Sequence, residues 1–501
     1  MIKIGWASRD VSTDKPVEIT GQFYKRISKG IIDPITITAL VMEDGADYAI
    51  FLSGDFVNAI DSIINDIRTA VFKKNPEIKT EKILFSVTHT HTSPCYMLNT
   101  DYDFAPTHGV EIASAKEYRD FLVDSASDSI VEAYENRKPG SYSYGYGYAV
   151  VSHSRRSLYF DDYGKRADGV NNSLIVDGHA KMYGNTNDEM FIGFEGASDA
   201  SVYLLYTFDE KDNLTGAIVN VPCPSQNSEA MDALSASFWN ETRNMIREKY
   251  GNIYILPQCA CAGDLAPRTL HINKAENRRY ELKYEGKIPE EKRDVPEICA
   301  RYDIAERIFT AFDEVYSWAK EEKHSDVKIS HTVDKVMLDA WKISEAEYEE
   351  AKRGYEAAVA LGFVSTDDKY ADYIENTQRS SGIARYKNIM NRYEKATEKK
   401  PIEMHAISIG DIAFVSHPFE LYIDFQHRIQ ARSPYTQTFL IQLAAAPNYE
   451  EGAGASGYVC HERGAEGIGY SANIFSNQIS PKGGNQLVEA TLAELKKLHK
   501  Q

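Results

Sequence analysis

The sequence has little cysteine, no long apolar run and fewer basic than acidic residues. Its cysteines are Cys95, Cys223, Cys259, Cys261, Cys299 and Cys460, and no two form a Cys-x-x-Cys pair. Six cysteines in 501 residues are too few for a disulfide framework, so we expect reduced thiols in or near the core. No apolar run approaches the ~18 residues of a membrane helix, which excludes membrane insertion. The first residues show no basic segment followed by an apolar stretch, which predicts a cytoplasmic protein.

The charge balance limits the classes of partner. The chain has 56 Lys and Arg against 74 Asp and Glu, a formal net charge of −18. Nucleic-acid binders and proteins of anionic membrane surfaces usually carry basic patches or a basic excess, so both classes are disfavoured. Hydrophobic residues make up 43% of the chain, enough for a substantial core. We therefore expect a globular protein that acts on a small polar molecule, with homo-oligomerisation left open.

Apolar and helical segments alternate along most of the chain. Short apolar runs, such as residues 49–53, 82–87 and 216–221, are separated by stretches with helical periodicity. This alternation predicts an α/β fold with an α+β layered core, formed by residues 1–269 and 401–501. Residues 270–400 are rich in Glu, Lys, Arg, Ala and Tyr, and we interpret them as a mostly helical insertion. Such an insertion would act as a lid or as an oligomer interface.

Two histidines follow the apolar run at 82–87. Residues 88–94 read Thr-His-Thr-His-Thr-Ser-Pro and contain His89 and His91. Side chains two residues apart on a strand face the same side, so both imidazoles would point to one place. The spacing indicates either a metal site or one ligand with a general base. The structural alternative is a polar strand end.

Three further turns carry candidate residues. Cys223 lies between two prolines after a predicted strand, where its thiol would be a zinc ligand, a nucleophile or a packing residue. Glu420 follows a proline turn at the expected start of a helix over 421–429, where the helix dipole favours a carboxylate. Asp264, in a Gly-Asp turn, is first of all a turn residue. Glycines beside Tyr458 and Tyr470 would let the backbone approach a ligand closely.

Taken in order, these segments resemble the catalytic domain of the neutral ceramidase family. Residues 4–12 are similar to that family's opening Gly-x-x-x-x-Asp-Ile-Thr, and residues 88–94 to its Thr-His-Thr-His-Ser-Gly-Pro. The Gly-Asp turn at 263–264, the Pro-x-Glu at 418–420 and the glycine–tyrosine stretch near the end extend the resemblance. It covers most of the chain outside 270–400. Nothing in the chain resembles the family's C-terminal immunoglobulin-like domain, so the resemblance is that of a divergent member.

The resemblance implies a zinc amidase, because the family splits the amide of ceramide into sphingosine and a fatty acid. It implies His89, Glu420 and Tyr458 as zinc ligands and His91 as the acid/base group. The family's other zinc-binding histidine corresponds to Cys223, so the implied site is a His–Cys–Glu–Tyr set holding one Zn²⁺. A thiolate is a good zinc ligand, although it donates more charge and weakens the metal as a Lewis acid.

The resemblance also implies two groups that polarise the substrate. These are Tyr470 and an arginine at 155–156, of which Arg155 is preferred to Arg156. One departure concerns the family motif Gly-Asp-x-Ser-Pro, whose serine is implicated in catalysis. Ala266 stands at that position here.

Three hypotheses for function follow. The first is a zinc-dependent hydrolase of ceramidase-like fold that cleaves an amide C–N bond in a small soluble substrate through a metal-activated water. The second is a metal-dependent lyase or hydrolase acting on a carbohydrate or polyol, motivated by the polar, tyrosine-rich composition and the missing serine. The third is a metal-binding or ligand-binding protein without turnover.

Overall fold

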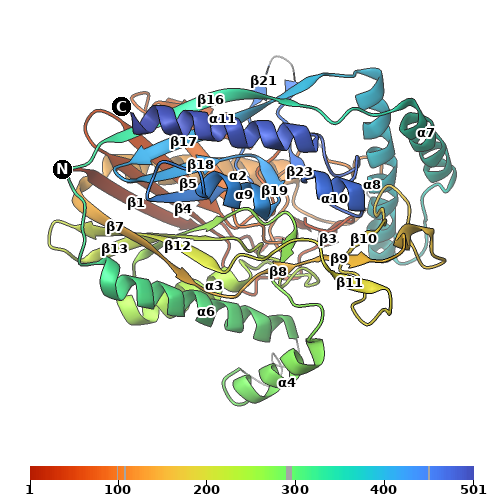
Figure 1. Cartoon of the computed structure of the whole chain (residues 1–501), viewed down its shortest axis with the longest axis horizontal. Coiled ribbons are helices and arrows are strands. Elements are labelled where there is room, and N and C mark those ends of the chain that lie inside the picture. The colour runs from red at the N-terminus through yellow and green to blue at the C-terminus, as the bar shows by residue number, and fades with distance from the viewer. Residues whose placement is uncertain (99, 107–108, 289–295, 450–451, 501) are drawn as a thin grey trace.

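The computed structural model describes residues 1–98, 100–106, 109–288, 296–449 and 452–500. Two β-sheets pack face to face, and helices cover their outer faces (Figure 1). In this view the C-terminal helix runs along one outer side and a helix of the middle of the chain along the other. The predicted α/β class with a layered core is confirmed.

The larger sheet has eight strands in the order β14-β13-β12-β7-β1-β4-β5-β6. Neighbours are antiparallel except for the outer pairs β13–β14 and β5–β6, which are parallel. The strands are β1 (Lys3–Asp10), β4 (Thr36–Glu43), β5 (Tyr48–Gly54), β6 (Ile83–Val87), β7 (Lys138–Tyr148), β12 (Ser201–Asp209), β13 (Leu214–Val221) and β14 (Tyr254–Cys259). Both parallel pairs end in loops that lead to the candidate site.

The smaller sheet has four strands in the order β16-β17-β18-β20. These are β16 (Ile329–Asp339), β17 (Lys399–Ile409), β18 (Ile412–Ser416) and β20 (Gln437–Ile441). One three-stranded sheet, β10-β9-β11, and four two-stranded sheets make up the rest of the described β-structure. Their strands are β2 (Glu18–Ile19), β3 (Arg26–Ile27), β8 (His153–Ser154), β9 (Arg156–Tyr159), β10 (Ala180–Met182), β11 (Phe191–Phe194), β15 (Leu265–Ala266), β19 (Phe419–Leu421), β21 (Asn448–Tyr449), β22 (Gly452–Ala453) and β23 (Gly457–Val459).

Amphipathic helices form the outer layers because each buries one apolar face on a sheet. The helices α1 (Ile63–Lys74), α2 (Ala115–Glu135), α3 (Phe238–Tyr250) and α6 (Pro296–Ala319) cover the larger sheet. The helices α9 (Ile423–Gln430) and α11 (Pro481–His499) cover the smaller one. The remaining helices are α4 (Asn273–Tyr284), α7 (Glu345–Ala360), α8 (Lys369–Glu394), α10 (Glu462–Gly467) and two short 3₁₀ turns, Thr80–Lys82 and Tyr163–Lys165. No described helix is long and apolar enough to cross a membrane.

The space between the sheets is filled by alternate residues of both. Strand residues one apart face opposite sides, so Leu40 faces the smaller sheet while Val41 faces the helices. The Phe51 ring of the larger sheet lies 4.9 Å from the Phe414 ring of the smaller, centroid to centroid. The apolar runs of the sequence are therefore strands buried on both faces.

The segment 270–400 is mostly helical, as expected, but two of its elements belong to the layered core rather than to an insertion. Its helix α6 packs into the core under the larger sheet through Ile304, Ile308 and Phe312, which recur at helical spacing. Its β16 pairs with β17 along all eleven residues and is a strand of the smaller sheet. The many charged residues around β16 concealed its β-branched content. The helix α4 and the hairpin of α7 and α8 lie outside the layers (Figure 1).

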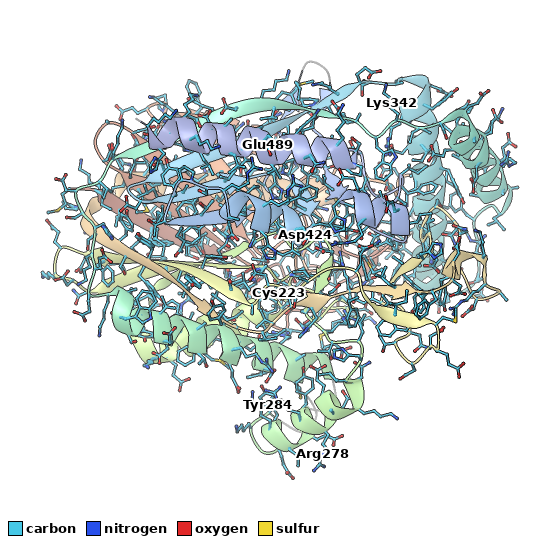
Figure 2. All side chains as sticks on the ribbon, viewed as in Figure 1. Cys223, Arg278, Tyr284, Lys342, Asp424 and Glu489 are labelled. Atoms are coloured by element: carbon cyan, nitrogen blue, oxygen red, sulfur yellow. The ribbon has the colours of Figure 1, made fainter. Side chains whose placement is uncertain are left out.

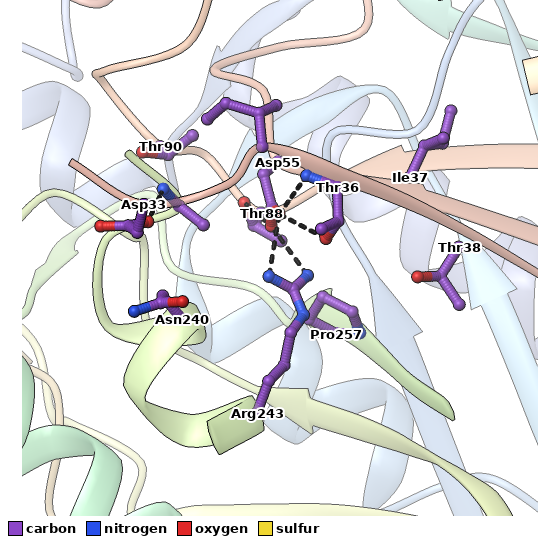
Figure 3. Close-up of polar contacts among 12 residues, drawn as sticks. Asp33, Thr36, Ile37, Thr38, Asp55, Thr88, Thr90, Asn240, Arg243 and Pro257 are labelled. Carbon is purple, nitrogen blue, oxygen red and sulfur yellow. Dashed lines mark hydrogen bonds and ion pairs between the residues drawn. The ribbon is translucent and has the colours of Figure 1, made fainter. Parts of the chain in front are cut away.

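A buried ion pair joins α3 to the larger sheet behind the candidate site (Figure 3). The two terminal nitrogens of the Arg243 guanidinium, Nη1 and Nη2, donate hydrogen bonds to the Asp55 carboxylate, at 2.9 and 3.0 Å. Thr36 donates its N–H and its hydroxyl to the same carboxylate, and the Thr88 hydroxyl lies 3.4 Å from it. Asp55 is fully buried and Arg243 nearly so. A buried charge is tolerated only when it is paired and hydrogen-bonded, as here.

We predict that Arg243→Met destabilises the fold by about 3 kcal/mol, because it leaves the Asp55 carboxylate buried without its cation. Urea unfolding measures the loss. The control is Arg432→Met, which removes an equally bidentate but exposed pair with Glu489 and should cost much less, because solvent screens an exposed pair. Equal losses in the two variants would contradict the prediction.

Candidate active site

The two histidines lie in a loop after β6, not on a strand. The Thr88 N–H donates to the Gly54 carbonyl and the His89 N–H to the Phe56 carbonyl, so the loop follows the extension of β5. His89 has a φ of +66°, a left-handed conformation that turns the chain. The imidazoles still meet, with their Nε2 atoms 3.3 Å apart. The predicted convergence is present, but a turn produces it rather than strand alternation.

The backbone fixes which nitrogen of His89 faces the cavity. Its Nδ1 lies 2.5 Å from the Val57 carbonyl oxygen, which only accepts hydrogen bonds, so Nδ1 carries the proton. The Nε2 therefore faces the cavity, 3.3 Å from Oε2 of Glu420. A histidine oriented through its other nitrogen in this way is the usual arrangement of a metal ligand.

Strand register places Glu420 beside Tyr458. The strands β19 and β23 pair in parallel, with Glu420 directly opposite Tyr458. The Tyr458 hydroxyl hydrogen-bonds the Glu420 carboxylate. Glu420 therefore lies on a short strand and not in the first turn of a helix as predicted; the following helix, α9, begins at Ile423. The pairing with β23, distant in sequence, overrides the local helical signal.

Arg155 lies in the chain between β8 and β9 and is buried against this pair. Its Nη2 donates to the Gly263 carbonyl at 2.8 Å and to the Tyr458 hydroxyl at 3.1 Å, and it lies 3.9 Å from Glu420. Arg156 instead forms a bidentate buried ion pair with Glu195. The expected choice of Arg155 over Arg156 matches the side chain that faces the cavity.

Tyr470 extends the wall formed by Tyr458. The centroids of the two rings lie 5.6 Å apart, and the Tyr470 ring meets the edge of Phe23 at 5.3 Å. The loop that carries Tyr470 is held from behind, because Arg156 donates to the carbonyls of Ile468 and Tyr470. The buried Arg156–Glu195 pair thus positions this wall of the cavity.

On the other side, His91 contacts two residues that the sequence analysis did not identify. Nε2 of Gln226 lies 2.9 Å from Nε2 of His91, and a carboxylate oxygen of Glu229 lies 3.5 Å from its Nδ1. Arg268 binds the same Glu229 carboxylate. The turn after β13 contains both Cys223 and Gln226. Its proline–cysteine pattern indicates a role for Cys223 and carries no signal for Gln226.

The structure does not bring Cys223 to this group. Its thiol donates to the Val151 carbonyl at 3.2 Å and lies in the core between the larger sheet and the helices α3 and α6 (Figure 2). Burial raises the pKa of the Cys223 thiol well above its usual value, which disfavours the thiolate that would bind zinc. The prolines on either side turn the backbone so that this side chain points inward. Ala266, at the place of the family's serine, is also buried in the core.

The protonation states follow from burial and from the neighbouring charges. Burial opposes ionisation of Glu420, but His89, Arg155 and Tyr458 hold its pKa below the usual value. Burial, followed by His89 and the nearby arginines, lowers the pKa of His91 well below its usual value, so its imidazole is neutral at pH 7. Burial raises the pKa of Tyr470, which keeps its hydroxyl protonated and able to donate.

These groups line one cavity of about 540 Å³. Of the predicted site residues it contains all but Cys223: His89, His91, Arg155, Glu420, Tyr458 and Tyr470. Its walls are formed by loops that follow strands of the larger sheet, by the short strands β10, β19 and β23, and by α8. A partly open cavity in which several ionisable groups converge is typical of a site for a small molecule.

The donor atoms around Glu420 fit a cation in part. His89 Nε2 and Glu420 Oε2 face each other at 3.3 Å, and both atoms can bind a cation when they are deprotonated. The Tyr458 oxygen would add a third donor as the neutral phenol, because burial and Glu420 raise its pKa well above the usual value, and three protein donors are usual in catalytic zinc sites. Within the described residues, however, no three His, Cys, Asp or Glu side chains are grouped to hold a metal ion. The set reaches three donors only with the phenol.

Two solved structures are similar to this chain over its whole length. One is a ceramidase complexed with C2, with a TM-score of 0.64 at 16% sequence identity, covering 100% of this chain and 75% of that chain. The other is the neutral ceramidase from Pseudomonas aeruginosa, with a TM-score of 0.61 at 16% identity, covering 99% of this chain and 75% of that chain. No protein-family model and no curated protein match the sequence. The fold is ceramidase-like.

Asp264, behind the site, predicts a pH dependence of stability. Its Oδ1 accepts the Ile423 N–H, its Oδ2 has no protein partner in the described structure, and burial raises its pKa to about 7. A folded-state pKa above the unfolded value of about 4 means that stability falls as the pH rises between the two values.

We predict that Asp264→Asn abolishes this fall, because the amide keeps the bond to Ile423 and carries no charge. The variant should be more stable than the parent at pH 8, by on the order of 2 kcal/mol, and the difference should vanish near pH 4. Thermal unfolding across this range measures it. Asp411→Asn, at an exposed turn, is the control and should leave the pH profile unchanged.

Proposed function

We propose that the chain is a metal-dependent hydrolase that cleaves an amide bond in a small polar substrate. The observation that carries the proposal is the convergence of His89, Glu420 and Tyr458 beside Arg155 in one cavity of a ceramidase-like fold. A fold alone supports many reactions, so the proposal depends on this group of side chains.

In this proposal His89, Glu420 and Tyr458 hold one Zn²⁺. A zinc ion at these donors would act as a Lewis acid and bring the pKa of a water molecule towards neutrality. Cys223 does not bind the metal, because its thiol lies in the core and donates a hydrogen bond to a backbone carbonyl there. The Val57 carbonyl keeps the His89 ring in the tautomer that offers Nε2 to the cavity.

The other residues supply proton transfer and charge stabilisation. His91, neutral at pH 7, accepts a proton from the attacking water and returns it to the amine as the C–N bond breaks. The buried Arg155 guanidinium and the Tyr470 hydroxyl stabilise the negative charge that develops on the carbonyl oxygen. Water and amide thus yield one carboxylate and one amine.

Metal analysis tests the ligand set. We predict about one zinc per chain in protein purified with zinc, and its loss in His89→Ala and Glu420→Gln. Cys223→Ala should retain the metal, because the thiol does not face the cavity. Inductively coupled plasma mass spectrometry measures the content. Metal lost in Cys223→Ala would restore the His–Cys–Glu–Tyr set, and a parent that binds no zinc would refute the hydrolytic mechanism.

Product analysis tests the reaction. We predict that the zinc-loaded protein releases an amine and a carboxylate from soluble amides. His91→Ala should keep its metal and lose about 10²–10⁴-fold in kcat, the usual contribution of a general base. Mass spectrometry identifies the products. An unsaturated sugar product that absorbs in the ultraviolet would favour the alternative, a lyase acting on a carbohydrate or polyol.

A further inference from the structure

One cation that lines the cavity comes from α8, outside the layered core. Arg385 lies on this helix with its Nε bonded to the Ser173 carbonyl. Its guanidinium carbon lies 5.4 Å from the centroid of the Phe23 ring and 5.9 Å from that of Phe475. Two rings and one carbonyl therefore fix the plane of the guanidinium.

Among the cations that line the cavity, Arg385 forms no close ion pair in the described structure, although the Asp101 carboxylate of the same lining acts on it from a greater distance. Arg155 lies 3.9 Å from Glu420, and Lys181 lies 2.8 Å from Asp177. In the part of the chain that the structure describes, no carboxylate lies within 4 Å of the Arg385 guanidinium. A half-buried, oriented guanidinium without an anion is suited to bind one from a ligand, because its planar donors match a carboxylate.

A row of aromatic rings leads from the proposed reaction centre to Arg385. Tyr458 contacts Tyr470, Tyr470 contacts Phe23, and Phe23 contacts the guanidinium. A ligand that spans this row passes two rings between its reacting carbonyl and its charged end. An apolar spacer of several methylene groups fits such a wall.

The charges of the cavity distinguish between anions. Its lining contains the carboxylates Asp101, Asp177, Glu229 and Glu420 against three cations. A phosphate dianion would meet this acidic surplus, whereas a carboxylate needs only the one unpaired guanidinium. The lining therefore favours a monoanionic group.

We propose that Arg385 binds the carboxylate of an acidic amide substrate whose scissile carbonyl lies beside Arg155 and Tyr470. This inference rests on the proposed amide hydrolase function and names its substrate class: amides that carry a carboxylate several bonds from the amide. The α7–α8 hairpin then acts as the wall that selects the substrate.

The test compares substrates that differ only in charge. The probes are the mono-p-nitroanilides of succinate, glutarate, adipate and suberate, each paired with the analogue whose free carboxylate is a carboxamide. For one chain length at least, kcat/KM of the parent should be tenfold or more higher for the carboxylate, as expected for a charge-assisted bond. Arg385→Met should bring that ratio near one, mainly through KM, and Arg385→Lys should restore part of it.

Two further variants make the result specific. Lys387→Met removes the same charge from an exposed position of α8 outside the cavity lining and should leave the ratio unchanged. Asp101→Asn tests whether the Asp101 carboxylate, which also lines the cavity, pairs with Arg385 and so competes with the substrate carboxylate. A parent ratio near one that rises only in Asp101→Asn would overturn the inference, as would a parent ratio that survives in Arg385→Met.

Binding without turnover separates the two proposals. Calorimetry of metal-free protein with the same mono-p-nitroanilides, which carry one charge, should show binding in the parent and Lys387→Met and none in Arg385→Met. If no amide is cleaved but this binding is found, the hydrolase proposal fails and the anion site stands. If amides are cleaved without preference for the carboxylate, the hydrolase stands and the inference about Arg385 fails.

Discussion

The ion pair of Asp55 and Arg243 is the contact on which the geometry of the site depends. One buried carboxylate joins strand β4, helix α3 and the first residue of the histidine loop, Thr88 (Figure 3). The next residue, His89, is held at a positive φ, which for a residue with a side chain persists only when its surroundings determine it. The pair supplies that rigid backing. Without it the two imidazoles would lose the common direction that makes them a site.

The rest of the site is positioned by backbone contacts rather than by side-chain packing. Register sets Glu420 opposite Tyr458, the Gly263 carbonyl holds Arg155, and the Val57 carbonyl orients His89. Groups fixed in this way do not need to reorganise when charge develops during a reaction. The interior also keeps water away from them, which strengthens each electrostatic contact. Preorganisation of this kind is what the proposed hydrolysis requires.

The sequence predicted the layered α/β core and six of the polar residues that line the cavity. Apolar runs between helical stretches are strong signals, and His89, Glu420 and Tyr458 lie in short motifs that can be recognised without a structure. Gln226 faces the cavity and Cys223 does not because of the way two prolines turn the chain, which the spacing of residues does not reveal. The strand β16 was hidden by charged neighbours, and Arg385 lies in a helix whose contact with the cavity is purely tertiary.

The position of α7 and α8 between two strands of the smaller sheet has an evolutionary consequence. They connect β16 and β17, two antiparallel neighbours that would otherwise form an ordinary hairpin. The connection leaves β16 and joins β17 at the same end of this strand pair. Its length and composition can therefore change by insertion or deletion while the layers and the reaction centre stay intact. Proteins with this fold can therefore acquire a new substrate selectivity through changes in the α7–α8 segment alone, while the residues of the reaction centre stay the same.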